Sequence, residues 1–327
     1  MIKTFVSSLL ATIVPTTVSG AEAQSLTSKT AVIGVFMPDT ASAYARYVTA
    51  FVQSLRELGY VEHQNIRIEY RYTDGKRERL SELATELVGL KPNAIVVVGG
   101  TLNATRRVTK TIPIVAANAG DLVTDGYVVS LAKPGGNITG TTNIDSELSA
   151  KRLELVKETL PKISRVAVIT HEGNRQDRDE LNETRVAGDI FGVRIQSVEI
   201  KDSGQILGAF TAVAEERAQA VIITNNSFTF ANRKQLLGLA ASKRLLTMCG
   251  RDAFVEHGCL ISYAGSRLDG WRRAAYFVDK ILKGAKPGDL PVQQPTKFEL
   301  IINLKTAKQI GLTIPANVLA RADRVIK

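Results

Sequence analysis

Polar side chains that could bind a small solute recur directly after the short apolar runs of this 327-residue chain. Asp suits an amine, Arg suits a carboxylate, and Tyr offers flat apolar area. Neutral hydroxyl and amide side chains suit the hydroxyl and carbonyl groups of an organic solute. The candidate ligand-binding residues are Asp39, Thr40, Ser42, Gly100, Thr101, Asn118, Asp121, His171, Asn174, Asn225, Asn226, Ser227, Arg251 and Tyr263.

The same residue types have a second interpretation. Asn, Ser, Thr and Asp are the preferred N-caps of helices, because their side chains accept a hydrogen bond from a free backbone N–H. Each candidate could therefore be a cap or a turn residue that contacts no solute. The residue pattern leaves both interpretations open at every single position.

Signatures of enzymes are largely missing. The three histidines, His63, His171 and His257, lack metal-ligand spacing, and no Cys-x-x-Cys occurs. Gly-x-Ser-x-Gly and phosphate-loop motifs are missing as well. His171 beside Glu172 is the one acid–base pair of interest, but adjacent side chains at a strand end usually diverge. We therefore expect no catalytic residue, no metal ion and no cofactor in a protein that is not an enzyme.

Short apolar runs alternate with longer stretches of helical periodicity, which predicts repeated β-α-β units and parallel sheets covered on both faces. Strands are expected at 31–37, 65–72, 94–98, 112–116, 165–169, 194–198, 220–224, 245–250, 259–263 and 298–303. Helices are expected at 44–58, 80–90, 150–160, 179–191, 206–217, 232–243, 271–282 and 306–310.

A second series of these units begins after the loop marked by Gly135, Gly136 and Asn137. The expected fold class is α/β, with two doubly wound parallel-sheet lobes joined by a hinge near 138–148. Residues 29–143 plus about 266–292 are assigned to the first lobe, and 144–265 plus about 293–327 to the second. Ligands of open α/β sheets bind at the carboxyl ends of the strands. The candidate residues are therefore expected in the cleft between the lobes.

The chain carries 42 Lys and Arg against 32 Asp and Glu, a formal net charge of +10. The basic residues occur singly or in pairs with acidic residues between them, which does not favour a nucleic-acid-binding surface. A basic surface of this kind can raise the rate at which anionic solutes or an acidic partner associate.

The first 23 residues have the three parts of a secretory signal peptide. Lys3 supplies the positive start, residues 5–14 are mostly apolar, and Ala21-Glu22-Ala23 is a small-x-small cleavage site. No later segment is apolar for long enough to span a bilayer. The sequence thus predicts an exported, periplasmic protein whose mature chain does not cross the membrane.

Cys249 and Cys259 could pair in an exported protein. They are expected in neighbouring parallel strands, Cys249 at the carboxyl end of one and Cys259 at the amino end of the next. At about 3.3 Å per residue their Cα atoms would lie more than about 10 Å apart. A disulfide needs Cα atoms within about 7 Å, so two buried free thiols are favoured.

Several long motifs resemble one family, the extracytoplasmic solute-binding proteins of ABC transporters in the type I periplasmic binding protein class. Its tryptophan/tyrosine-type subfamily is the most similar. The resemblance covers nearly the whole mature chain. It rests on LRELGYVE at 55–62, SLAKPGGNITG at 130–140, KRLEL at 151–155 and PTKFELIINLKTA at 295–307.

The resemblance implies a monomeric receptor whose two lobes close around one small molecule and then dock on a membrane permease of an ABC transporter. The solute would be polar or aromatic, such as an amino acid or a related carboxylate. Thr101 matches the ligand-loop threonine of the family, and Asn174 matches the asparagine after the first strand of the second lobe. Asp121-Leu122-Val123 replaces the usual Asp-Pro-Val, and Thr170-His171-Glu172-Gly173 stands where an aromatic and Asn-Pro are common.

Two other functions remain as alternatives, and a third is disfavoured. A periplasmic sensory receptor would use the same fold and hand its signal to a kinase or chemoreceptor. An exported enzyme would turn its solute over. A sugar-responsive transcription regulator would need an N-terminal helix-turn-helix, and the signal peptide occupies that place.

Overall fold

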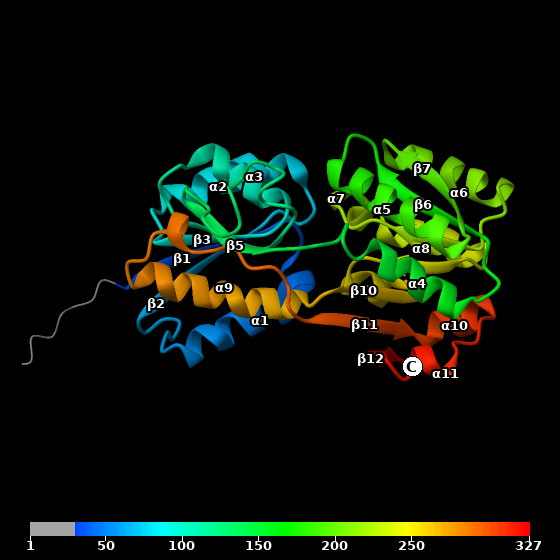
Figure 1. Cartoon of the computed structure of the whole chain (residues 1–327). Coiled ribbons are helices and arrows are strands. Elements are labelled where there is room, and N and C mark those ends of the chain that lie inside the picture. Colours follow the sequence, from blue (N-terminus) through cyan, green and yellow to red (C-terminus); the bar gives the residue numbers. More distant parts are fainter. Residues whose placement is uncertain (1–29) are drawn as a thin grey trace, which may run out of the picture.

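The computed structural model describes residues 30–327, so the expected signal peptide at 1–23 lies outside the described residues. Two α/β halves lie side by side, each built on its own sheet (Figure 1). The expected α/β class with two mainly parallel sheets is confirmed.

The first sheet has five parallel strands in the order β2-β1-β3-β4-β5. They are β1 (Ala31–Met37), β2 (Ile66–Tyr72), β3 (Ala94–Val97), β4 (Ile114–Ala119) and β5 (Ile138–Thr142). Its helices are α1 (Ala41–Glu57), α2 (Leu80–Gly89), α3 (Gly100–Val108) and α9 (Arg267–Leu282), with the 3₁₀ turns η1 (Arg77–Arg79) and η4 (Pro287–Asp289).

Side chains of β1 alternate between two buried layers, as a strand covered on both faces requires. Ile33, Val35 and Met37 pack with α1 and α9, whereas Phe36 packs with α2 and α3. Helix α9 follows the second half in sequence but packs against α1, β4 and β5 in space. The aromatic core of this layer forms where Tyr44 and Tyr47 of α1 meet Trp271 of α9.

The second sheet has seven strands in the order β12-β11-β10-β9-β8-β6-β7, of which only the β10–β11 pair is antiparallel. They are β6 (Arg165–His171), β7 (Arg194–Ile200), β8 (Ala220–Ile223), β9 (Leu246–Cys249), β10 (Ile261–Gly265), β11 (Phe298–Asn303) and β12 (Arg324–Ile326).

Helices cover both faces of the second sheet as well. They are α4 (Ser149–Thr159), α5 (Arg175–Phe191), α6 (Ile206–Glu215), α7 (Ser227–Ala231), α8 (Arg233–Ser242), α10 (Leu304–Ile310) and α11 (Ala316–Leu319), with the 3₁₀ turns η2 (Ser203–Gln205) and η3 (Asp252–His257). Local sequence determines where α5 begins and ends. Asn174 caps its first turn, and Gly192 follows it in the left-handed conformation that favours glycine.

The chain passes between the halves three times: after β5, between β10 and α9, and before β11. The backbone N–H of Ser266 in the second crossing donates to the carbonyl of Lys297 in the third, at 2.8 Å. The side chain of Arg152 in α4 donates to the backbone of both Asp145, in the first crossing, and Tyr263, in β10. Hydrogen bonds therefore connect the second crossing to the third, and the first crossing to β10 through Arg152.

The prediction of two free thiols is wrong, because Cys249 and Cys259 form a disulfide with Cα atoms 6.6 Å apart. The prediction treated Cys259 as the first residue of an extended strand. Gly258 instead turns the chain with a φ of 104°, and the ladder of β10 against β9 starts only at Ile261. Cys259 thereby lies beside the end of β9 rather than a strand's length away from it.

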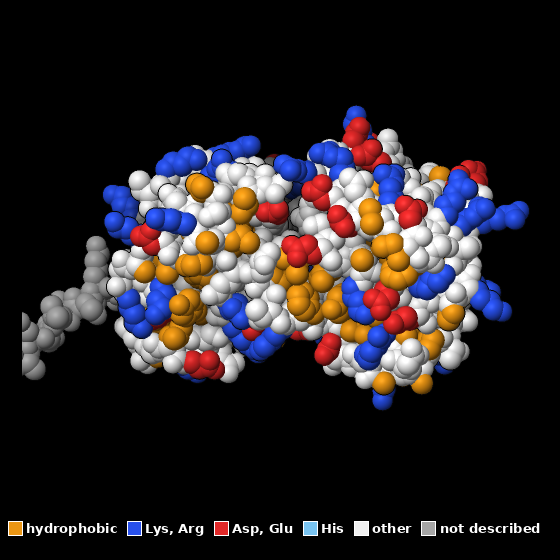
Figure 2. Space-filling model, viewed as in Figure 1, with side chains coloured by type: hydrophobic (Ala, Val, Ile, Leu, Met, Phe, Trp, Pro, Cys, Tyr) orange, Lys and Arg blue, Asp and Glu red, His pale blue; other side chains and the backbone are white. Residues whose placement is uncertain are grey.

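Figure 2 shows the two rounded halves side by side, with Lys and Arg side chains spread over both halves on this face. None of the helices between residues 30 and 327 has the length and apolar character that crossing a bilayer requires.

Candidate functional site

A cleft of about 650 Å³ lies between the two halves, at the carboxyl ends of strands from both sheets. From the first half it is lined by the turns after β1, β3 and β4, and from the second by the turns after β6, β8 and β9. Both sheets present helix N-termini and loop side chains at these ends, so a ligand there would contact both halves at once.

Eight of the fourteen candidate residues line this cleft: Asp39, Gly100, Asn118, Asn174, Asn225, Asn226, Ser227 and Arg251. Two of them also cap helices. Asn174 accepts a hydrogen bond from the N–H of Asp177 in α5, and Asn226 accepts one from the N–H of Thr229 in α7. The cap and cleft interpretations are therefore not exclusive at these positions.

The other six candidates lie away from the cleft lining. Thr40 caps α1 and contacts the exposed Ser42, while Thr101 is buried and bonded to the backbone of Val98 and Phe36. Asp121 accepts from the N–H groups of the turn that follows it. The rings of His171 and Tyr263 stack on Phe228 and Phe298, respectively.

Sequence reasoning missed a group of arginines and aromatic rings at one end of the cleft. Arg233, Arg267, Tyr44 and Phe230 all line it beside the expected Arg251. The guanidinium carbons of Arg251 and Arg233 lie 3.6 and 4.2 Å from the centroid of the Phe230 ring. One signal was available: Arg233 opens α8, and a cation in the first turn opposes the helix dipole.

Arg251 and Arg267 are each 8% exposed, and neither guanidinium donates a hydrogen bond or forms an ion pair within residues 30–327. Burial lowers the pKa of Arg251, and the charge of Arg267 lowers it further. Burial opposes the charge of Arg267, but Tyr47, Tyr44 and Asp252 raise its pKa. Neither guanidinium has a hydrogen-bonded counter-ion, so the pair attracts negative charge.

Asn118 holds Arg267 in place. Its side-chain amide donates to the carbonyl of Arg267 at 2.8 Å, across the start of α9. Asn118 has a φ of 54°, a conformation that few residues other than glycine adopt. Gly270 makes room for it, because a Cβ there would lie 2.0 Å from the amide oxygen of Asn118.

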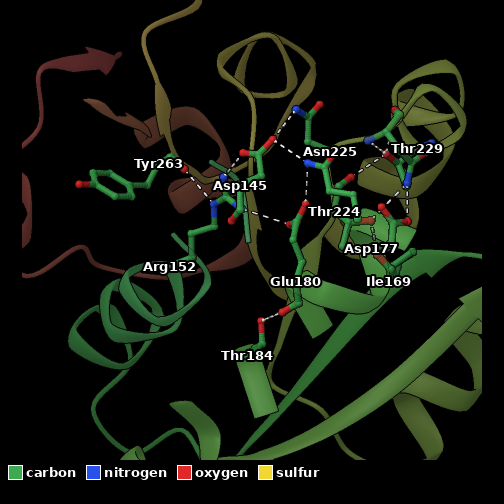
Figure 3. A network of polar contacts seen from close by, with 12 residues as sticks. Asp145, Arg152, Ile169, Asp177, Glu180, Thr184, Thr224, Asn225, Thr229 and Tyr263 are labelled. Atoms are coloured by element: carbon green, nitrogen blue, oxygen red, sulfur yellow. Dashed lines mark hydrogen bonds and ion pairs between the residues drawn. The ribbon is translucent and has the colours of Figure 1, made fainter. Parts of the chain in front are cut away.

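A buried polar network lies beneath the second-half wall of the cleft (Figure 3). Arg152 pairs with both Asp145 and Glu180, and all three side chains are almost fully buried. The side-chain amide of Asn225 donates to Oδ2 of Asp145 at 3.0 Å. Burial raises the pKa of Glu180 well above its usual range, and the charges of Asp145 and Asp177 add to that shift. The network links a cleft residue, Asn225, to the first crossing between the halves.

A smaller hollow of about 260 Å³ adjoins the cleft and is lined by several carboxylates, among them Asp121, Asp125 and Asp179. Partial desolvation raises the pKa of Asp125, whose side chain is still exposed, and the charge of Asp121 raises it further. The residues from 30 onward hold no cluster of His, Cys, Asp and Glu side chains that could bind a metal ion.

The halves also touch beside the cleft, where α1 meets η3. Arg46 donates to Asp252 at 2.8 Å and to Glu256 at 3.0 Å, and the hydroxyl of Tyr47 donates to Asp252 at 3.0 Å. Across the cleft itself, Arg233 lies 3.9 Å from Asp39.

Residues 30–326 match the family described as ABC transporter substrate binding protein. A curated relative, the tyrosine-binding protein of Clostridioides difficile (strain R20291), is 23% identical over 263 residues, which are 80% of this chain and 75% of the relative. The resemblance noted in the sequence motifs is thereby confirmed.

Solved structures share the fold. A conserved domain protein from Vibrio cholerae is 26% identical with a TM-score of 0.82, over 91% of this chain and 100% of its own. A domain from Streptococcus pneumoniae, solved in complex with L-Trp, is 23% identical with a TM-score of 0.82 and the same coverage.

Proposed function

The chain belongs to the ABC transporter substrate-binding proteins, a family of solute-binding proteins rather than enzymes, and we propose that it is the solute-binding component of an ABC importer. It captures a small polar or aromatic organic solute between its two halves and delivers that solute to a membrane permease.

The observation that carries the proposal is the cleft of about 650 Å³ walled by strand ends of both sheets. A solute that contacts both walls favours the closed arrangement over the open one by the free energy of those contacts. Two relatives, a tyrosine-binding protein and a domain solved in complex with L-Trp, agree with a small organic solute.

The moving bodies are the two lobes. We assign residues 29–143 and about 266–292 to the first and 144–265 and about 293–327 to the second, in keeping with the packing of α9 on α1, β4 and β5. The eight candidates that line the cleft form its proposed contact set, joined by Arg233, Arg267, Tyr44 and Phe230.

The proposal also includes export of the protein to the periplasm. Cleavage of the signal peptide after Ala23 would release residues 24–327 into the periplasm as a monomer, where the permease is the macromolecular partner. Family members act outside the cytoplasm in general, which supports this location.

The test is a thermal-shift screen of residues 24–327, after unfolding and refolding to remove any bound solute, against amino acids, organic acids, nucleosides and sugars. A solute present at about 100 times its Kd should add about 2.7 kcal/mol of stability, a rise of several degrees in Tm. Mass spectrometry then recovers the solute, and small-angle X-ray scattering compares the radius of gyration with and without it.

We expect a hit that is recovered unchanged and that makes the protein more compact. A hit that is chemically altered would instead identify an enzyme. A hit that closes the lobes but fails to stimulate ATP hydrolysis by the reconstituted permease would favour the sensory receptor.

A further inference from the structure

Two buried cations with no partner face the same cleft. Arg251 and Arg267 are both more than nine-tenths buried, and the Nε of each is enclosed without a hydrogen-bond acceptor. The acidic side chains near Arg267 are already engaged, Asp252 with Arg46 and Tyr47 and Asp145 with Arg152. The N–H donors of the two guanidinium groups are therefore left for a ligand in the cleft, which both residues line.

The cleft as a whole has an excess of positive charge. Six basic residues line it, Lys76, Arg77, Arg175, Arg233, Arg251 and Arg267, against three acidic ones, Asp39, Asp74 and Asp125. None of the three carboxylates is buried. Asp74 pairs with Arg79, and Asp39 lies near Arg233. An ammonium group would find no buried, unpaired counter-ion here, whereas a carboxylate would find two.

The two guanidinium groups belong to opposite walls and are held in place. Arg251 follows β9 of the second sheet and lies over the Phe230 ring. Arg267 begins α9, which packs on the first sheet, and its backbone is fixed by Asn118. A carboxylate between them would receive charge-assisted hydrogen bonds from both halves at once, the contact that drives closure.

We propose that the solute is an organic acid whose carboxylate lies between Arg251 and Arg267 and whose charge is not balanced by an ammonium group. This inference rests on the proposed function and names its substrate class. It separates this chain from a receptor for zwitterionic amino acids, in which the net charge of the ligand is zero.

The test uses residues 24–327 and pairs of probes that differ only in charge. The pairs are benzoate with benzamide, succinate with succinamide, and 3-(4-hydroxyphenyl)propionate with its primary amide. L-Tyrosine and tyramine extend the last pair, because they share its ring. Thermal-shift measurements at millimolar probe concentration rank the probes by the rise in Tm. Calorimetry then gives the Kd of each probe that binds.

We expect at least one acid to raise Tm while its amide and tyramine do not, and 3-(4-hydroxyphenyl)propionate to exceed L-tyrosine. Arg251→Gln and, separately, Arg267→Gln should weaken the Kd of the acid about tenfold or more, because each removes a hydrogen bond to a charged group. Arg272→Gln makes the same charge change on an exposed residue of α9 and should leave Kd unchanged. Two separate variants keep the test valid if one of them fails to fold, as judged by circular dichroism.

Equal binding of an acid and its amide would overturn the inference, as would equal losses in Arg251→Gln and Arg272→Gln. A panel in which no acid binds would overturn it too. If a sugar, an amine or L-tyrosine then binds and closes the lobes, the proposed importer function stands and only the substrate class is wrong. If no solute of any class binds, the proposed function fails together with the inferred substrate class.

Discussion

Asp177 is a buried carboxyl beneath the cleft whose pKa is raised. Its Oδ2 accepts from the N–H of His171 at 2.7 Å and from the amide of Asn226 at 2.6 Å, while its Oδ1 is buried with no partner. Burial raises the pKa of Asp177 from 3.8 to about 6. The buried, unpartnered Oδ1 is poorly solvated, which disfavours the ionised carboxylate and accounts for the direction of the shift.

Asp177 therefore makes stability fall as pH rises. Between about pH 4 and pH 6 the folded protein keeps a proton on Asp177 that the unfolded chain releases, so the folded state binds more protons and the free energy of unfolding decreases with pH. A shift of about two units corresponds to about 3 kcal/mol. On acidification from neutral pH to about pH 4, wild type should gain that amount relative to Asp177→Asn, which cannot titrate.

Urea denaturation across this pH range measures the difference. Asp179→Asn is the matched control, because Asp179 lies on the same helix but is exposed. If the wild-type and Asp177→Asn curves run parallel from neutral to acidic pH, the carboxyl is ionised in the folded protein and the pKa is not raised.

The segment between β9 and β10 shows how one element holds cleft residues in place. The disulfide closes a loop in which the cysteines are 10 residues apart, and that loop carries Arg251 and Asp252. In the chain-entropy description, closing a loop of this size contributes about 3 kcal/mol. Cys249→Ala/Cys259→Ala should lose about that much free energy of unfolding, and reduction of the wild type should lower Tm to the same value.

The control for that prediction is internal: adding a reductant to the double variant should change nothing. Two free thiols titrated in wild-type protein that has been unfolded without a reductant would contradict the disulfide. So would a Tm that is unaffected by reduction.

The elements themselves were predictable wherever local sequence determines them. Alternating apolar runs and amphipathic stretches predicted ten of the strands, because strands buried on both faces need continuous apolar residues. The strand rule also identified Asn174, Asn225 and Arg251 as residues at the strand ends. What it missed depends on backbone turns and long-range packing. The turn at Gly258 brings the cysteines together, and α9 carries Arg267 to the first sheet, four residues beyond Tyr263, the last candidate named from the sequence.

At the scale of the whole molecule, the free energy between open and closed arrangements decides how tightly a solute is held. Three crossings connect the halves, and the contact of α1 with η3 also joins them beside the cleft. Arg46 bonds to Asp252 and Glu256 there, and Tyr47 also reaches Asp252. We expect this contact to break when the lobes open, because its partners belong to opposite halves.

Removing Arg46 should therefore shift the solute-free protein toward the open arrangement. The side chain of Arg46 is 35% exposed, so solvent screens the pair and its contribution is about 1 kcal/mol. That amount corresponds to about a fivefold change in the ratio of closed to open molecules. Small-angle X-ray scattering of solute-free protein should show a larger radius of gyration for Arg46→Ala than for wild type. Arg56→Ala, an exposed position at the end of the same helix, should match wild type. Equal radii for Arg46→Ala and Arg56→Ala would mean that the contact persists in the open form or contributes nothing to closure, and the crossings alone would then set the equilibrium.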